Sequence, residues 1–321
     1  MSRGEFDIIR DYFRRRAGQR EDLLLGIGDD GAVVKAAGEL AWVVDTINSG
    51  VHFPEDAPAH VVGHRVLAVN LSDMVAMGAE ARWMLLSLSL PEIRESWLSG
   101  FSHGLLSLAD SAGITLAGGD TTRGPLAVTV TLLGPLHARP VTRGGAQAGD
   151  HILVSGTLGD ARAGLDIALG SGEPADAVER ALLSRYLYPE PRLGLSSLLS
   201  RHASAAIDLS DGLVSDLGHI LAASGVGAVV DAHRLPTSDA LKAHAPEEAQ
   251  ALAAAGGDDY EILCTASDSA APGLVAAAKE VGITLTQIGQ IRREPGLVIA
   301  DDQGRPFDVD GSYSHFGEDD A

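Results

Sequence analysis

The sequence contains very few lysines. There are three, Lys35, Lys242 and Lys279, and none of them completes the G-x-x-x-x-G-K-[ST] pattern of a P-loop. The V-A-I-K and H-R-D motifs of protein kinases are also missing. Both classes of nucleotide-binding site are therefore excluded, and any phosphate group that the protein binds has to be neutralised by metal ions or by arginine.

Cysteine, positive charge and long apolar runs are scarce as well. The single cysteine, Cys264, excludes an intramolecular disulfide and a thiolate cluster for zinc. The net charge of −20 argues against binding to nucleic acid or to an anionic membrane. No apolar run reaches the about 20 residues of a membrane-spanning helix, and the charged segment 1–16 lacks the apolar core of a signal peptide. We expect a soluble cytoplasmic protein.

The chain is long and apolar enough for two domains, with 321 residues of which 45% are hydrophobic. Helical spacing and strand-like runs are mixed without a regular repeat, which predicts an α+β protein whose domain boundary lies between about residues 135 and 150. Helices are predicted near residues 5–16, 57–79, 92–112, 158–170, 177–187, 191–201 and 213–224. Strands are predicted near residues 81–90, 226–231, 259–265 and 283–290. Residues 40–53 are predicted as a strand running into a loop, and residues 114–134 as strand, glycine loop and strand.

Residues 26–31 read GIGDDG, which has the G-x-G-x-x-G form of a dinucleotide-binding loop. Such a loop needs a helix directly after the glycines, but the short β-branched stretch AVVK follows here. Its two carboxylates would also repel a phosphate. The loop is therefore either a solvated turn or a holder for a cation that meets the phosphate in place of the protein.

Aspartates recur at the ends of apolar segments, where strand ends and glycine turns can bring them to one edge of a sheet. Hard cations such as Mg²⁺ take oxygen ligands of this kind together with substrate phosphates. Taken singly, most of these aspartates fit a turn equally well. Asp73 differs because it lies in a mostly apolar helix, where a carboxylate needs a partner. The set comprises Asp29, Asp30, Asp45, Asp73, Asp120, Asp208 and Asp211.

Nearly the whole chain resembles the thiamine-monophosphate kinases, a family within the aminoimidazole ribonucleotide synthetase superfamily. The motifs that carry the resemblance are GEFDIIRDYF, GIGDDGAVV, DTINSGVHF, AVNLSDMVAMGA, GGDTTRGPL, TRGGAQAGD, AIDLSDGLVSDLGHI, GGDDYEI and GSYSHF. The resemblance implies an N-terminal ATP- and Mg²⁺-binding α/β domain over residues 1–138 and a C-terminal α+β domain over residues 139–321. It also implies a homodimer, in which the N-terminal sheets form a barrel across the dimer and active sites lie at the interface.

The implied reaction transfers a phosphoryl group from ATP to thiamine phosphate, giving thiamine diphosphate, with several Mg²⁺ ions. By motif, the implied Mg²⁺ ligands are Asp30, Asp45, Asp73, Asp120, Asp208 and Asp211. The implied ATP contacts are Gly119, Asp120, Arg143 and Ser210, and the implied thiamine-phosphate contacts are His52, Asp258 and Tyr313. No general base is implied. Asp258 departs from the family pattern, which usually has glutamate at this position.

Other interpretations stay open at the level of sequence. His52 also fits a loop histidine with satisfied hydrogen bonds, and Tyr313 also fits packing of the C-terminal segment. The whole chain also fits another ATP-dependent enzyme of the superfamily, of the cyclo-ligase type, or a dimer that binds nucleotide or divalent cations without turnover.

Overall fold

The computed structural model describes residues 5–14, 20–170, 173–301 and 305. The chain forms two compact units, which are described here one at a time. The first comprises residues 1–74 and 79–137, and the second comprises residues 75–78 and 138–321. Helices and strands occur in both units, so the predicted mixed α+β class is confirmed.

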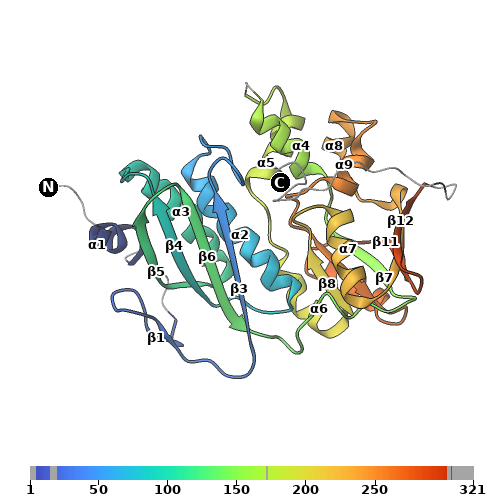
Figure 1. Cartoon of the computed structure of the whole chain (residues 1–321), viewed down its shortest axis with the longest axis horizontal. Coiled ribbons are helices and arrows are strands. Elements are labelled where there is room, and N and C mark those ends of the chain that lie inside the picture. The colour runs from blue at the N-terminus through green and yellow to red at the C-terminus, as the bar shows by residue number, and fades with distance from the viewer. Residues whose placement is uncertain (1–4, 15–19, 171–172, 302–304, 306–321) are drawn as a thin grey trace, which may run out of the picture. The chain divides into compact units, whose positions relative to one another are not determined.

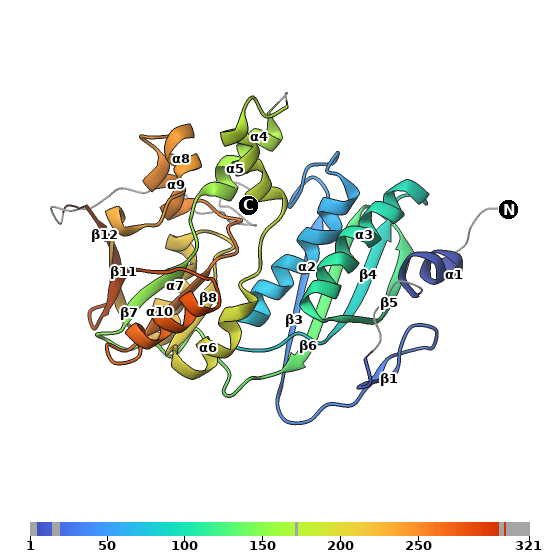
Figure 2. The same ribbon diagram turned by 180° about the vertical axis from the view of Figure 1, so that it is seen from behind.

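The first unit is a four-stranded sheet with two long helices on one face (Figures 1 and 2). β4 and β5 are parallel, and β6 is antiparallel to both β3 and β4. In the order of the sheet, the strands are β3 (Leu40–Asn48), β6 (Ala127–Pro135), β4 (Trp83–Leu90) and β5 (Thr115–Arg123). The helices are α2 (Ala59–Ala76) and α3 (Glu95–Ala112). Burial alternates residue by residue along β6, as expected for a sheet with one covered face.

Two glycines set the distance between α2 and α3. A Cβ atom at Gly63 would lie 2.2 Å from the carbonyl oxygen of Phe101, and one at Gly104 would lie 1.9 Å from that of His60. Both distances are far below van der Waals contact, so the two helix backbones touch directly at these positions. The distance between α2 and α3 is therefore fixed by backbone contact.

The other face of this sheet carries large apolar side chains that are exposed in the single chain. Trp42 and Val44 of β3 are 69% and 59% exposed, and Leu85 of β4 is 38% exposed. These residues alternate with buried ones along the same strands, so they lie on the face opposite to α2 and α3. We call Trp42, Val44 and Leu85 the apolar sheet face.

The N-terminal segment begins with α1 (Glu5–Ile8), which continues as a π-helix, η1 (Ile9–Arg14). The helix predicted over residues 5–16 is therefore present in its described part, with the second half in π geometry. A two-stranded arm follows, made of β1 (Leu23–Leu25) and β2 (Val33–Val34).

The second unit is built on a six-stranded mixed sheet with the order β12-β9-β11-β7-β10-β8. Its strands are β7 (His151–Ser155), β8 (Ala205–Asp208), β9 (Gly227–Asp231), β10 (Ile262–Ala266), β11 (Leu285–Arg292) and β12 (Gly296–Ala300). Its helices are α4 (Asp160–Leu169), α5 (Ala177–Leu187), α6 (Ser196–His202), α7 (Leu213–Ser224), α8 (Asp239–His244), α9 (Ala249–Ala255) and α10 (Ala271–Glu280), with short 3₁₀ turns η2 (Leu193–Leu195) and η3 (Ala232–Arg234).

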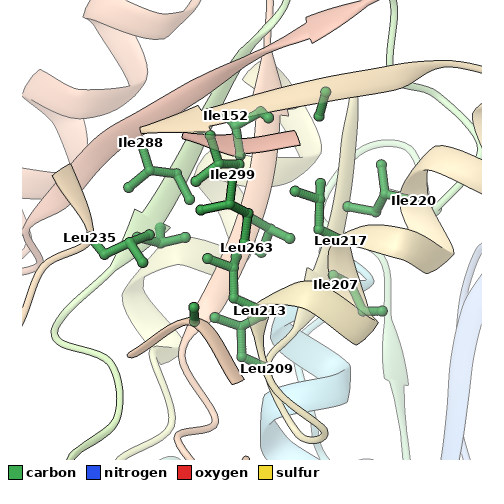
Figure 3. Packing of buried hydrophobic residues seen from close by; sticks show 14 of the residues in the cluster. Ile152, Ile207, Leu209, Leu213, Leu217, Ile220, Leu235, Leu263, Ile288 and Ile299 are labelled. Carbon is green, nitrogen blue, oxygen red and sulfur yellow. The ribbon is translucent and has the colours of Figure 1, made fainter. Parts of the chain in front are cut away.

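Both faces of this sheet are covered. Ile152 and Leu263 point into a core with Leu217 of α7 on one face (Figure 3). On the other face, Leu153 and Cys264 pack in a second cluster with residues of α6 and α10. Strands buried on both sides need apolar residues at successive positions, which explains runs such as ILV in β7 and ILC in β10.

The strand, glycine loop and strand predicted over residues 114–134 are present as β5, the segment 124–126 with Gly124, and β6, while Gly118 and Gly119 lie within β5. Asp45 was expected to end a strand, but it lies in the middle of β3. Helices α8 to α10 and strands β7, β8 and β12 were not predicted individually. Among the helices that the structure describes, none combines the length and hydropathy that crossing a membrane requires.

Candidate active site

The GIGDDG loop and strand β5 line a cavity of about 960 Å³ in the first unit. Asp30, Gly119 and Asp120 are among its lining residues, so the structure brings together three predicted site residues that are 90 positions apart in the chain. Gly119 has a φ of 151°, and a Cβ atom there would lie 1.8 Å from the carbonyl oxygen of Leu86. This position accepts only glycine, and it lets β5 approach β4 closely beside Asp120.

The GIGDDG loop is followed by strand β2 and not by a helix, which rules out the dinucleotide cradle. Asp29 and Asp30 are exposed, and the Asp29 carboxylate accepts a 2.9 Å hydrogen bond from the Asp30 N–H. Asp29 thus stabilises the turn. Gly28, with a φ of 123°, leaves room for the guanidinium of Arg14, which lies about 3.0 Å from where a Cβ would stand. A cationic side chain and two carboxylates therefore border the same cavity.

Asp45 and Asp73 form a second acidic pair in the first unit. Their side chains are hydrogen-bonded to each other, and burial raises the pKa of Asp45 above its usual value. Asn70 holds the backbone of Asp45 in place. Its Oδ1 accepts the Asp45 N–H at 3.0 Å, and its Nδ2 donates to the carbonyl of Val66 at 2.8 Å. The half-buried position of Asp73 within helix α2 agrees with the predicted helix.

In the second unit, Asp208 ends strand β8, and Ser210 and Asp211 follow in the turn before α7. Asp216, in the first turns of α7, accepts hydrogen bonds from the backbone N–H groups of Ser210, Asp211 and Gly212 at 3.0, 3.1 and 3.2 Å. Burial, together with the charges of Asp208 and Asp211, raises the pKa of Asp216 to about 7. Asp208 and Asp211 are thus close neighbours, held on a turn that Asp216 closes.

The remaining predicted contacts are spread along the chain. His52 lies in the turn after β3, and its Nδ1 accepts the Asn48 N–H at 3.1 Å, so in the neutral ring Nε2 carries the proton. Arg143 is exposed in the segment before β7. Asp258 lies in the loop before β10 with a φ of 69°. Tyr313 lies outside the described residues.

Asn70 and Asp216 were not among the predicted site residues. Asn70 precedes Asp73 by three residues within AVNLSD, which places both on one side of a helix, and that spacing was a usable signal. Asp216 lies one turn into a helix after a glycine, where a carboxylate can accept N–H groups of the preceding turn. The partner of Asn70 could not be assigned from local sequence, because Asp45 lies in another element.

The donor set suits a hard cation. Across the described part of the chain, no three His, Cys, Asp or Glu side chains gather as a ready metal-binding group. The Asp45–Asp73 pair nevertheless places two carboxyl groups in contact, which is stable only with a shared proton or a cation between them. Mg²⁺ commonly uses one or two carboxylates and completes its shell with water and substrate phosphates. Pairs of carboxylates therefore fit Mg²⁺ bound together with a nucleotide.

Known proteins place this geometry in a family. Residues 28–136 match the N-terminal domain of AIR synthase related proteins, and residues 147–302 match their C-terminal domain. The thiamine-monophosphate kinase of Escherichia coli is 44% identical over 98% of this chain and 99% of its own length. A crystal structure of the Stenotrophomonas maltophilia thiamine-monophosphate kinase superposes with a TM-score of 0.86 at 44% identity, covering 96% of this chain and 99% of that one.

A second solved structure, AaThiL complexed with AMPPCP and TMP, superposes with a TM-score of 0.79 at 30% identity, covering 98% of this chain and 99% of that one. The similarity thus extends over both units and over every described motif of the candidate site. The chain belongs to the thiamine-monophosphate kinase family, within the AIR synthase related proteins.

Proposed function

We propose that the protein transfers the terminal phosphoryl group of ATP directly to thiamine phosphate, producing thiamine diphosphate and ADP. The observation that carries the proposal is the cavity that Asp30, Gly119 and Asp120 line together, in a chain of this family. A glycine backbone and carboxylates at one cavity suit a nucleotide that arrives with divalent cations.

The acceptor explains why no general base is needed. A phosphate monoester has a second pKa near 6, so it is largely a dianion at neutral pH and is already a nucleophile. The remaining obstacle is the repulsion between this dianion and the triphosphate, which makes positioning and charge neutralisation the main tasks of the site. In-line attack breaks the bond between the β–γ bridging oxygen and the γ-phosphorus and forms a bond from the acceptor oxygen to that phosphorus.

We assign the Mg²⁺ ligands to Asp30, Asp45, Asp73, Asp120, Asp208 and Asp211. When bound, Mg²⁺ supplies positive charge that neutralises the phosphates of both substrates. Arg143 adds a guanidinium to the phosphates, and Gly119 contacts them through its backbone. Because the Ser210 N–H already donates to Asp216, a phosphate contact from Ser210 uses its hydroxyl.

His52, Asp258 and Tyr313 are proposed contacts for thiamine phosphate. His52 would donate from Nε2, since its Nδ1 already accepts the Asn48 N–H. Asp258 is one methylene shorter than the glutamate usual in the family, so its contact with substrate is longer or bridged by water. An aromatic ring such as that of Tyr313 can stack on a cationic thiazolium.

We further propose that the protein is a cytoplasmic homodimer, with residues 1–138 as the ATP- and Mg²⁺-binding domain and residues 139–321 as the C-terminal domain. The apolar sheet face supports the dimer, because large apolar patches on a monomer usually mark an interface. In this assembly the two N-terminal sheets close into a barrel across the two-fold axis.

The function is tested by incubating the pure protein with Mg-ATP and either thiamine phosphate or unphosphorylated thiamine. We expect ADP and thiamine diphosphate from thiamine phosphate, and very slow turnover of thiamine, whose hydroxyl needs a base. Equal ADP release from both acceptors would contradict the mechanism. ADP release with an aminoimidazole precursor would instead indicate a cyclo-ligase, and binding of ATP without turnover on any acceptor would indicate a non-catalytic dimer.

A further inference from the structure

The GGDDYE segment has an unusual backbone. Asp258 has a φ of 69° and Tyr260 a φ of 49°, and these are the non-glycine residues with positive φ among those the structure describes. Residues with side chains adopt this region sparsely, and tyrosine does so less readily than aspartate. Such a conformation persists only where the surroundings hold it, and it is often associated with function. The segment therefore needs anchors.

The residues that alternate with this pair supply those anchors. Asp259 is 4% exposed, and its carboxylate accepts the Gly159 N–H at 2.7 Å and the Ala161 N–H at 3.2 Å, at the start of α4. Glu261 is fully buried and accepts hydrogen bonds from Ser155 at 2.5 Å and from Arg185 at 2.7 Å. The polar groups of both acids are thereby compensated.

Arg192 completes the Glu261 site. Its Nε donates to Glu261 Oε2 at 2.7 Å and its Nη2 donates to Glu261 Oε1, which is a two-pronged arginine–carboxylate pair. Gly156 leaves room for the Glu261 carboxylate, because a Cβ atom at Gly156 would lie 2.1 Å from Glu261 Oε1. We call Glu261, Ser155, Arg185 and Arg192 the Glu261 cluster.

The same segment is bonded to the turn that carries Ser210 and Asp211. The Asp258 N–H donates to the Ser210 carbonyl at 2.8 Å, and the Tyr260 N–H donates to the Leu209 carbonyl at 2.8 Å. In return, the Leu209 N–H donates to the Glu261 carbonyl at 2.8 Å. A shift of Glu261 would therefore move both the 257–261 segment and the turn with Ser210 and Asp211, because backbone hydrogen bonds join them.

We infer that the Glu261 cluster is a positioning device, which holds the backbone of Asp258 in its left-handed conformation so that this carboxylate is presented to the phosphorylated substrate. The inference rests on the proposed function for the role of Asp258, while the holding of the loop stands on the contacts alone. Glu261 and the two arginines act through Asp258 and do not touch substrate. A cluster that only stabilised the fold would be equally satisfied with Asp258 in any conformation.

The test uses Arg192→Lys in the full-length protein, because lysine keeps the charge but cannot make the two-pronged contact. Hydrogen exchange of the 257–261 amides is measured beside kcat and KM for thiamine phosphate, in the wild-type and in the Asp258→Ala background. Arg234→Lys is the matched control, since Arg234 is 56% exposed and pairs with Asp231 at 3.8 Å on the surface of the same unit.

We expect exchange in residues 257–261 to accelerate at least tenfold in Arg192→Lys and to stay unchanged in Arg234→Lys. We also expect kcat/KM for thiamine phosphate to fall about tenfold or more, since misplacement by about 1 Å can cost about 100-fold. This loss should vanish in the Asp258→Ala background, because both changes then remove the same contact. If Arg192→Lys does not fold, Ser155→Ala removes one donor to Glu261 and carries the same expectation.

Unchanged exchange in residues 257–261 would overturn the inference, as would an equal loss of kcat/KM in both backgrounds. Absence of turnover by the wild-type protein on thiamine phosphate would instead overturn the proposed function. The exchange measurement would then still decide whether the cluster holds the loop.

Discussion

Two acidic sites, one in each unit, are compensated in opposite ways. In the first unit the carboxyl group of Asp45 meets that of Asp73, and burial raises the pKa of Asp45. In the second unit the carboxylate of Glu261 meets the guanidinium groups of Arg185 and Arg192. The first site joins two acids, whereas the second joins one acid to two arginines.

This difference separates an acid that maintains the fold from one that awaits a ligand. Glu261 is compensated within its own unit, so nothing further has to bind for its charge to be tolerated. Asp45 and Asp73 lie against each other, so a bound cation would balance their charge. Substitutions at Glu261 should therefore change stability first, and substitutions at Asp73 should change activity first.

The largest effect is expected from Glu261→Gln. Losing the negative charge removes the buried carboxylate that the partly buried Arg185 and Arg192 share, which should lower the free energy of unfolding by about 3–5 kcal/mol. Urea denaturation of the full chain measures this loss. Glu190→Gln is the control, because Glu190 contacts Arg192 at 3.1 Å but is 72% exposed, and a change of less than about 0.5 kcal/mol is expected there. Equal losses in both variants would show that the burial of Glu261 does not give its ion pairs a special contribution to stability.

Asp73→Asn should reduce turnover about 100- to 1000-fold while the protein stays folded. Asparagine matches the size of aspartate, but its neutral amide cannot balance the charge of Mg²⁺. In EDTA the melting temperature should stay equal or rise, because the carboxyl pair is then relieved. The measurements are turnover against Mg²⁺ concentration and a thermal melt in EDTA, with the exposed Asp110→Asn of α3 as control. Normal turnover with an unchanged Mg²⁺ dependence would take Asp73 out of the site.

Trp42→Asp tests the apolar sheet face. A buried interface tryptophan often contributes about 2 kcal/mol or more, so the dimer dissociation constant should rise by about 30-fold or more. Sedimentation across a concentration series measures it. Val298→Asp changes a 44% exposed apolar residue of β12 in the other unit and should leave the assembly unchanged. A fully active wild-type monomer would contradict the shared site.

The smallest effect is expected at Cys264 in the native protein. Burial raises the pKa of its thiol to about 12, so at pH 8 only about one thiol in ten thousand is ionised. A thiol reagent should therefore label Cys264 only when the second unit opens, and labelling should be faster in Glu261→Gln. Rapid labelling of the folded wild-type protein would show that this core is less closed than its packing indicates.

Much of the fold could be predicted from apolar spacing. The predicted helix over 213–224 coincides with α7, and the helix containing Asp73 was placed correctly. Glycines usually weaken strands, so the sequence did not show that Gly118 and Gly119 lie within β5. Gly119 stays in the strand because the backbone of β4 lies where its side chain would be, which is a contact between distant segments.

The candidate site could be predicted only as a list of residue types. Sequence spacing gave the aspartates but not which of them meet, since the Asp45–Asp73 contact joins a strand to a helix. The positive φ of Asp258 follows from the anchors of its neighbours, Asp259 and Glu261, whose partners lie about 70 to 100 residues away in the chain. Local sequence cannot specify such constraints. The roles assigned to the individual site residues remain predictions.

The glycine contact between α2 and α3 has a consequence for mutational scans. Gly63 and Gly104 carry no chemistry, but even alanine at either position would force the helices apart and move the end of α2 that bears Asp73. A scan scored by activity would rank these two glycines beside the aspartates. Substitutions there would be harmful because the two helix backbones touch, and not because the glycines take part in the reaction. Positions of this kind should therefore be excluded before catalytic residues are assigned from such data.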